Sequence, residues 1–376
     1  MRLIYCQSAA IYENVGNFKV ANNLYKSAYN VAIQQPKTDS MQAEILLRLA
    51  NTSREQAFWN QALNYYNTAC NLYEKLEDYN GLVQGILETG IMFEKAGYFE
   101  EALNHYSRAL ELSEDLDNDI LKGESLLLLA SASRKIHRHD IALQNLKQAR
   151  EIFKGCQHAE KLTRCLLSIG KVYFAMKEYD KVLSYYDEGL LIAVQTDDRL
   201  MEGTFLMEIG NILRDQKKYD QALRVYAEAV QIENVLNNPL RLAILTMNMG
   251  IVYHTKNQLE AAYICYSRAQ SKFKERANQS DIAFHLAECQ FHLGKIYILR
   301  NAPQAAVECY QDVLRIWNAK QRPLYVAIAM FNLGNAYMQL GDRKNAQTFL
   351  EKALESFIDL GSPYAKVAKQ ALDQFH

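Results

Sequence analysis

The sequence predicts an all-α protein, an α-solenoid of about nine stacked helix pairs. Three observations predict it: a repeat of about 40 residues, helical spacing of the apolar residues within each repeat, and a globular composition with only 5 prolines. A fixed period in this range is typical of stacked supersecondary units that bury their apolar faces against one another. Because a solenoid grows in one dimension, a length of 376 residues does not by itself imply several separate cores.

A small residue, which we call the anchor, marks the same place in every repeat. The anchors are Ala9, Ala50, Gly90, Ala130, Gly170, Gly210, Gly250, Gly294 and Gly334, with successive spacings of 41, 40, 40, 40, 40, 40, 44 and 40. Alanine stands twelve residues after eight of the nine anchors, with Val182 the exception. Tyrosine stands four residues later in seven, with Leu146 and Leu350 the exceptions. This regularity predicts nine tandem repeats over residues 1–361.

Each repeat carries two helical patterns, as residues 87–110 (LETGIMFEKAGYFEEALNHYSRAL) illustrate. A first helix is expected to end near Gly97, and a second follows with apolar residues at helical spacing: Ala102, Leu103, Tyr106, Ala109 and Leu110. The intervening turn is short, so the two helices should be antiparallel neighbours. Gly90 and Ala102 should lie where the backbones approach closely, with Tyr106 and Phe93 filling the space beside them.

The linkers carry residues that end and begin helices. Prolines stand between repeats (Pro239, Pro323, Pro363), in a turn within a repeat (Pro303) and near the end of a repeat (Pro36), so none interrupts a helix. Acidic and amide residues in the linkers are expected to cap helix N-termini: Asp78, Asp115, Asp117, Asn118, Asp197, Asp198, Asn237 and Asn238.

Three features depart from the regular repeat. The 44-residue spacing adds about one helical turn near residues 272–281, which predicts a longer helix with a local change of curvature, or else a bump that contacts a partner. Residues 362–376 predict a C-terminal capping helix with Tyr364, Val367, Ala368 and Leu372 on one face. No such cap precedes the first repeat, which favours a piece of a longer protein over an end covered by a partner.

The pattern of each helix pair resembles the tetratricopeptide repeat. It consists of a small residue, an aromatic residue three positions later, and then alanine, tyrosine and alanine. The resemblance covers residues 2 to about 360, although the period exceeds the usual one of about 34 residues. It is similar above all to a long-repeat subgroup: Pins-type spindle-orientation adaptors, kinesin light chains and bacterial Rap-type regulators. The N-terminal effector bundle of the Rap type is absent from this sequence. The resemblance implies a right-handed superhelix whose first helices line a concave groove.

Composition argues against several classes of protein. A net charge of −1 gives no reason to expect nucleic acid or an acidic membrane as partner. The sequence carries no signal peptide and no apolar run of about 18 residues, so a soluble protein is expected. The seven cysteines are scattered, odd in number and without a CxxC motif. Free thiols in the reducing cytoplasm are therefore expected, and a redox or modification role is the alternative.

The residues predict neither an enzyme nor a cofactor or metal site. The sequence carries no glycine-rich phosphate loop and no nucleophile elbow. Its only histidine cluster, His137 and His139 with Asp140, lacks the three or four converging ligands of a metal centre. An enzyme with an unusual site stays a third hypothesis, behind two binding functions.

By the resemblance, groove-facing residues stand one and four positions after each anchor, with others a turn earlier. In these rows basic residues outnumber the acids Glu13 and Glu94, and the expected partner-binding residues are Asn51, Arg54, Arg134, Lys171, Asn211, Arg214, Lys295 and Asn335. Arginine offers forked donors to carboxylates, and asparagine can bind an extended backbone. Alternatively, these side chains are solvated or pair with nearby acids such as Glu55, Glu124 and Asp215. Toward the C-terminus an apolar stretch of groove is suggested by Phe291, Ile298, Leu299, Phe331 and Met338, although some of these should pack between helices.

Together these features predict a non-enzymatic scaffold or adaptor. It would hold an extended or helical segment of a partner protein, bound through its acidic side chains, in the groove. The alternative is a sensory or regulatory module of a larger signalling protein, in which a bound peptide or small molecule changes the pitch of the superhelix. A clamp for a chaperone's C-terminal carboxylate is not expected, because the position three before the anchor is apolar in all nine repeats. The oligomeric state is left open.

Overall fold

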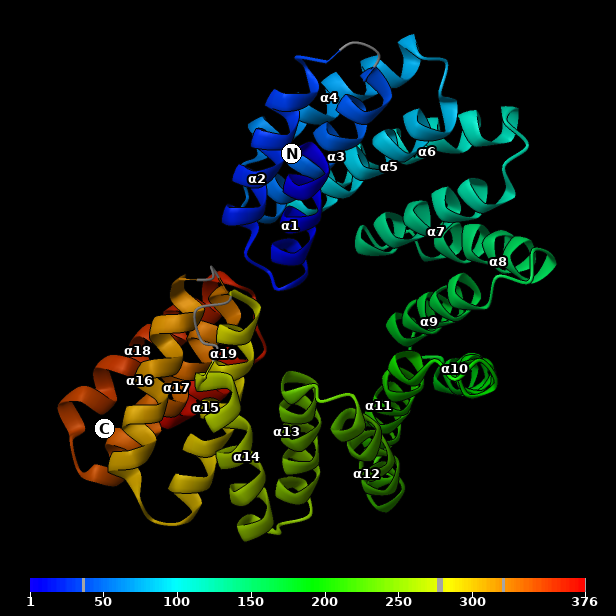
Figure 1. Ribbon diagram of the computed structural model, residues 1–376. Helices are drawn as coiled ribbons and strands as arrows, with labels where there is room; N and C mark the ends of the chain where they lie inside the picture. The colour runs from blue at the N-terminus through cyan, green and yellow to red at the C-terminus, as the bar shows by residue number, and fades with distance from the viewer. Residues whose placement is uncertain (36–37, 276–279, 320–321, 376) are drawn as a thin grey trace. The chain divides into compact units, whose positions relative to one another are not determined.

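The computed structural model describes residues 1–35, 38–275, 280–319 and 322–375, and this part of the chain is an all-α solenoid of consecutive antiparallel helix pairs (Figure 1). The first helices of the pairs are α1 (Arg2–Asn14), α3 (Asp39–Glu55), α5 (Tyr79–Ala96), α7 (Asp119–Lys135), α9 (Ala159–Ala175), α11 (Arg199–Asp215), α13 (Pro239–Thr255), α15 (Ser280–Leu299) and α17 (Pro323–Leu340). The second helices are α2 (Phe18–Ala32), α4 (Trp59–Lys75), α6 (Phe99–Asp115), α8 (His139–Gly155), α10 (Tyr179–Gln195), α12 (Tyr219–Val235), α14 (Leu259–Lys274), α16 (Pro303–Ala319) and α18 (Arg343–Asp359). A shorter helix, α19 (Tyr364–Leu372), and a 3-10 turn, η1 (Asp373–Phe375), come after the last pair.

The helices form two compact units, Met1–Asp197 and Asp198–His376. Within each unit, every helix packs on the helix before it and the helix after it. The first helices of successive pairs also touch, as α3 does with α5 and α5 with α7. In the N-terminal unit, α1, α3, α5, α7 and α9 therefore present a common surface, which we call the first-helix face.

Most glycine anchors are small because a tyrosine ring covers them, as the sequence predicts, whereas Leu350 covers Gly334. A Cβ atom added to Gly210 would lie 2.5 Å from Cε1 of Tyr226, and one added to Gly294 would lie 2.7 Å from Cε1 of Tyr310. Each ring belongs to the second helix of the same repeat, so the two backbones approach closely at this point. Phe93 packs against the cluster that contains Ala102 and Tyr106, and its ring stacks on His105 with the ring centres 5.2 Å apart.

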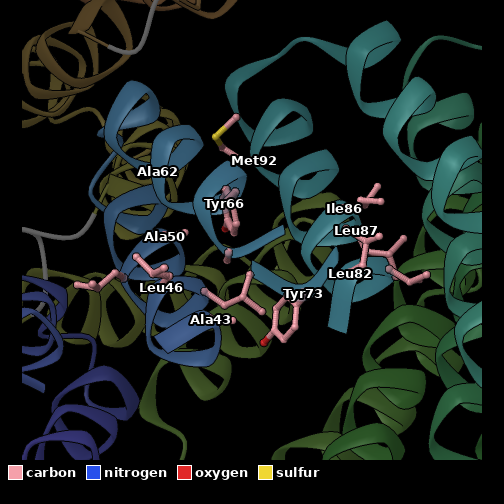
Figure 2. Packing of buried hydrophobic residues seen from close by; sticks show 14 of the residues in the cluster. Ala43, Leu46, Ala50, Ala62, Tyr66, Tyr73, Leu82, Ile86, Leu87 and Met92 are labelled. Carbon is pink, nitrogen blue, oxygen red and sulfur yellow. The ribbon is translucent and has the colours of Figure 1, made fainter. Parts of the chain in front are cut away.

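The core of each pair is built from the repeated alanine and tyrosine positions. The residues twelve positions after the anchors are fully buried, and those sixteen positions after are at most 3% exposed. Figure 2 shows one such cluster, in which Ala50, Ala62 and Tyr66 lie among the buried side chains of α3, α4 and α5. Burial of large side chains against alanine and glycine gives the dense packing that stabilises a folded interior.

Most helices end on a residue in the left-handed conformation. Gly97 has φ of 90° after α5, and Asp117, Asp197 and Asn237 take the same place with φ between 50° and 53°. Such a residue turns the chain so that the next N–H groups bond the last carbonyls of the helix. Asp117, Asp197 and Asn237 were expected to be N-caps, so for them that expectation is wrong, and Asp115 is the last residue of α6.

The N-caps are the residues directly after these turns. The side chains of Asp78, Asn118, Asp198 and Asn238 each accept a hydrogen bond from a backbone N–H in the first turn of the next helix. The prediction is therefore confirmed for these four residues. Pro239, Pro303 and Pro323 are the first residues of their helices, where a missing N–H leaves no bond unmade. Pro36 lies outside the described residues.

The two predicted departures from regularity are visible in part. Helix α15 is 20 residues long, whereas most of the other helices have 17, and its additional length precedes the anchor Gly294. Residues 276–279 of the predicted insertion lie outside the described residues. Helix α19 packs on α18, with Ala368 buried beside Phe357. Its predicted apolar face is wrong in part, because Val367 is 47% exposed and Tyr364 is 51% exposed.

No helix in the described part of the chain is long and apolar enough to cross a membrane. All seven cysteines are free of disulfide bonds.

Candidate functional site

The first-helix face of the N-terminal unit contains a cavity of about 230 Å³ between α5, α7 and α9. Its apolar lining consists of Leu87, Ile91, Leu127, Leu128 and Phe153. Its polar lining consists of Gln84, Glu88, Glu124, Lys161 and Arg164. An apolar lining with a few polar groups is typical of sites that hold a side chain of a ligand.

Two further hollows adjoin this cavity on the same face. One, of about 510 Å³, lies between α1 and α3, and the other, of about 710 Å³, lies where α3, α5 and α7 meet. The α1–α3 hollow and the α3–α5–α7 hollow share Glu44 and Arg48 in their linings. The α3–α5–α7 hollow in turn shares Gln84 and Glu88 with the α5–α9 cavity. The three hollows therefore lie one after another along the first-helix face.

The two acids that line the α5–α9 cavity, Glu88 and Glu124, already have cationic partners. Arg54 Nη1 lies 2.6 Å from Glu88 Oε2, and Lys161 forms an ion pair with Glu124. By contrast, the guanidinium groups of Arg48 and Arg164 have no ion-pair or hydrogen-bond partner among the residues that the structure describes, and both residues are exposed. In the α5–α9 cavity the unpaired charge among the described residues is thus positive, whereas the other two hollows hold Glu44 beside Arg48, with Glu13 in one and Asp78 in the other.

Two of the expected binding residues, Asn51 and Arg54, are bound to the framework of the second repeat, and Asn51 also lines the hollow of about 710 Å³. The hydroxyl of Tyr66 donates to Asn51 Oδ1 at 2.5 Å and accepts from Arg54 Nη1 at 3.1 Å. Burial alone would lower the pKa of Arg54, but Tyr66 and Glu88 raise it, so the guanidinium stays charged. Arg54 also lies 3.1 Å from Glu55, one of the acids considered as an alternative partner.

The other two expected residues of this unit, Arg134 and Lys171, differ from Arg54 in having no ion pair among the described residues. Arg134 is half-buried near the end of α7, and Lys171 is exposed on α9. Neither of them lines the three hollows.

The remaining expected residues lie in the C-terminal unit. Asn211 Oδ1 accepts from the Tyr226 hydroxyl at 2.8 Å and from Asn248 Nδ2 at 3.1 Å. Arg214 lies 3.0 Å from Asp215, as the alternative interpretation anticipated. Lys295 Nζ lies 4.6 Å from the ring centre of Phe291. Asn335 is half-buried on α17.

The sequence interpretation missed most residues that line the hollows. Glu44, Gln84, Glu124 and Arg164 stand six residues before their anchors, and Arg48 and Glu88 stand two before. A signal was present, because the four residues of the first set recur at intervals of 40 and are all polar. Helical geometry places such positions one or two turns along the same face as the rows that were chosen.

The apolar stretch expected near the C-terminus is largely packing. Phe291 is 8% exposed and contacts Tyr310 and Trp317, and Ile298 packs against the same core. Phe331 packs against the core that contains Phe357, whereas Leu299 is 56% exposed.

The histidine cluster likewise gives no ligand set. The His137 and His139 rings meet edge to face at 5.9 Å. Within the described ranges, no three His, Cys, Asp or Glu residues are grouped to hold a metal ion.

Comparisons with known families match the repeats directly. A tetratricopeptide-repeat family model matches residues 87–155 and 162–232, and a second one matches residues 327–356. Comparison with curated protein sequences finds no match.

Several solved structures are similar to this chain in fold. One is a signal transduction ATPase with a tetratricopeptide-repeat sensor from Pyrococcus horikoshii (17% identity, TM-score 0.66, covering 94% of this chain and 55% of that chain), so this chain spans about half of that protein's length. Another is the apo form of the quorum sensor NprR from B. thuringiensis (11% identity, TM-score 0.62, covering 94% and 97%). A third is a Rap protein complexed with competence and sporulation factor (15% identity, TM-score 0.59, covering 96% and 98%).

Proposed function

Because the chain is a tetratricopeptide-repeat protein, we propose that it is a non-enzymatic adaptor that binds a partner peptide with acidic side chains on the first-helix face of its N-terminal unit. The observation that carries the proposal is the presence of two exposed arginines on this face. Arg48 and Arg164 are exposed and unpaired among the described residues, while Glu88 and Glu124 are already held by Arg54 and Lys161. An incoming carboxylate would therefore find free guanidinium donors.

The hollows supply the apolar part of recognition. An extended or helical segment could place one apolar side chain against Leu127 and Leu128 and an acidic side chain near Arg164. Many modest contacts along a preformed surface give affinity without a large ordering cost in the protein. This assignment replaces Arg54 by Arg48 and Arg164 as the carboxylate-binding residues.

A second candidate function is a sensory or regulatory module that responds to a bound peptide. It is supported by the names of similar structures, which include a quorum sensor, a repeat sensor and a Rap protein bound to competence and sporulation factor. The two functions differ in the effect of binding on the protein's shape. An adaptor keeps its shape, whereas a sensor changes shape, which small-angle scattering with and without peptide would detect.

Location in the cytoplasm is part of the same proposal. Seven cysteines without a disulfide bond are typical of a reducing compartment.

The test is a peptide-binding screen that compares the wild-type chain with the double variant Arg48→Glu/Arg164→Glu. We expect the wild type to select peptides in which an apolar residue is flanked by Asp or Glu. Each charge reversal should cost about 1.5–3 kcal/mol, or roughly ten- to a hundredfold in affinity, because a charged hydrogen bond is lost.

The matched control is Arg108→Glu, which reverses an exposed arginine on the second helix α6 and should leave binding unchanged. Equal binding by the double variant and the wild type would rule out this face as the site. Equal selection of Asn/Gln peptides and Asp/Glu peptides would rule out the acidic partner while leaving the face in place.

A further inference from the structure

The buried tyrosines of the repeats allow a comparison between equivalent positions. In four repeats the hydroxyl donates to a polar side chain one or four residues after the anchor: Tyr25 to Glu13, Tyr66 to Asn51, Tyr106 to Glu94 and Tyr226 to Asn211, at 2.5 to 3.0 Å. The polar residues of these two rows therefore complete the core, because a buried hydroxyl requires a partner.

The seventh repeat breaks this rule. Ile251 and His254 stand one and four residues after its anchor, Gly250. The hydroxyl of Tyr266 is buried and has no hydrogen-bond partner within the described residues. A buried polar atom without a partner destabilises the folded state, because no hydrogen bond offsets its loss of water. In a native structure such an atom therefore calls for an explanation, for example a missing ligand.

A second buried atom without a partner among the described residues belongs to a ring that stacks on Tyr266. The imidazole of His292, from α15, stacks on the Tyr266 ring with the ring centres 5.2 Å apart and the planes 7° from parallel. Its Nδ1 is also buried and has no partner in the described part of the chain. Helices α14 and α15 thus each bring a buried polar atom without a partner among the described residues to one pair of stacked rings in the C-terminal unit.

The surroundings of this pair are rich in positive charge. Lys295 has no ion pair among the described residues, and its ammonium group rests on the ring of Phe291. Burial lowers the pKa values of His254, His292 and Lys295, and the charge of Lys295 lowers those of both histidines further. Glu288 is the acid that acts in the opposite direction on His292. Both histidines and Lys295 are partly exposed, whereas Tyr266 is fully buried.

We propose that Tyr266, His292 and Lys295 form a second binding site, in the C-terminal unit, for a carboxylate group of a ligand. A carboxylate is an acceptor only, so it can receive the Tyr266 hydroxyl proton and an imidazole N–H at once. Its charge would be balanced by Lys295 and by a protonated His292. This site is independent of the first-helix face of the N-terminal unit and does not rest on the function proposed for it.

The site implies uptake of a proton on binding. The groups that face His292 are Lys295 and Glu288 from α15, His254 from α13, Tyr266 from α14 and Arg214 from α11. Without ligand, burial lowers the pKa of His292 to about 4, so the ring is neutral at higher pH. A bound anion favours the imidazolium and raises its pKa. Affinity should therefore fall as pH rises between about 4 and the raised value, by at most about tenfold per pH unit.

The test uses the full chain with labelled histidine rings and follows the His292 resonance by NMR, assigned with the variant His292→Gln. The probe is formate, which is the smallest carboxylate and stays ionised at moderately acid pH, with chloride at equal ionic strength as the reference. We expect formate to move the titration midpoint of His292 upward by about one pH unit or more. Inorganic phosphate should move it less, because a larger and more strongly hydrated anion fits a buried hydroxyl poorly.

Two tyrosine variants supply matched controls. Tyr266→Phe should weaken formate binding by about tenfold and leave the thermal stability of the free chain unchanged or higher, because it removes a hydroxyl without a partner among the described residues. Tyr226→Phe should lower the stability, because it removes a hydroxyl that is bonded to Asn211. The proposal would be overturned if formate left the titration midpoint of His292 unchanged. It would also be overturned if Tyr266→Phe and Tyr226→Phe lost the same amount of stability. A response to phosphate alone would overturn the carboxylate assignment.

Discussion

At the scale of single residues, the polar rows beside the anchors have a structural task. A tyrosine fills the space over most of the small anchors, and its hydroxyl needs a partner inside the protein. Asn51, Glu94 and Asn211 provide that partner. A row of polar residues that looks like a ligand-binding surface in sequence can therefore be the inner support of the fold.

Arg54 is the clearest case, and it yields a prediction on stability. Arg54→Glu would place a carboxylate beside Glu55 and Glu88 and remove a donor from Tyr66. Because the Arg54 side chain is only 11% exposed, we expect a loss of about 3 kcal/mol in the free energy of unfolding. Chemical denaturation followed by circular dichroism measures it.

The control for this prediction is Arg48→Glu, about one and a half helical turns away on the same helix. Its side chain is exposed and unpaired among the described residues, so the free energy of unfolding should change by no more than about 0.5 kcal/mol. Similar stability of the two variants would show that Arg54 is as free as Arg48, and would return it to the candidate binding residues.

At the scale of helices, the pair is defined by two close contacts. The anchor of the first helix lies under a ring from the second, and the chain between them turns through a residue with positive φ. Glycine fits the anchor position because it has no side chain. The close packing that it allows outweighs the roughly 0.5–1 kcal/mol by which glycine destabilises a helix.

Gly210→Leu tests the close contact in the sixth repeat. The new side chain would collide with the ring of Tyr226, and overpacking on this scale should cost about 3 kcal/mol or more. The matched control is Gly155→Leu at the end of α8, where a Cβ atom meets no other atom within 4 Å. That change should be neutral or stabilise the chain by up to about 0.8 kcal/mol. The melting temperatures of both variants measure this difference in stability. Equal melting temperatures would contradict the close packing at Gly210.

At the scale of the whole molecule, the chain has two compact units in which each helix contacts mainly its neighbours. Stability in such an architecture is close to a sum of local terms and nearest-neighbour terms. A local defect should therefore stay local.

Hydrogen exchange measured by mass spectrometry can test this locality. In Gly210→Leu we expect faster amide exchange in α11 to α14, which surround the substituted residue along the chain, and unchanged exchange in α3 to α6. Uniformly faster exchange along the chain would show that the two units unfold as one.

The sequence by itself determined the architecture. The period of about 40 residues, the apolar stripes and the alternation of small and aromatic positions predicted the helix pairs, the packing of Tyr106 beside Gly90 and the caps at Asp78 and Asn118. These features depend on neighbours in the same helix or helix pair, so a regular spacing suffices to reveal them. The left-handed conformation of Asp117 was not predicted, because aspartate is common both at helix N-caps and in turns.

Only the tertiary structure decided which charges are free. The partner of Arg54 is Glu88, 34 residues away in the next repeat, while Arg48 in the same helix has none among the described residues. The rings of Tyr266, whose hydroxyl has no partner in the described ranges, and of His292 are also brought together from different repeats. A long side chain can reach several acceptors across a helix interface. Which acceptor it bonds depends on distances of a few ångströms, and these distances cannot be read from the spacing of residues in a sequence.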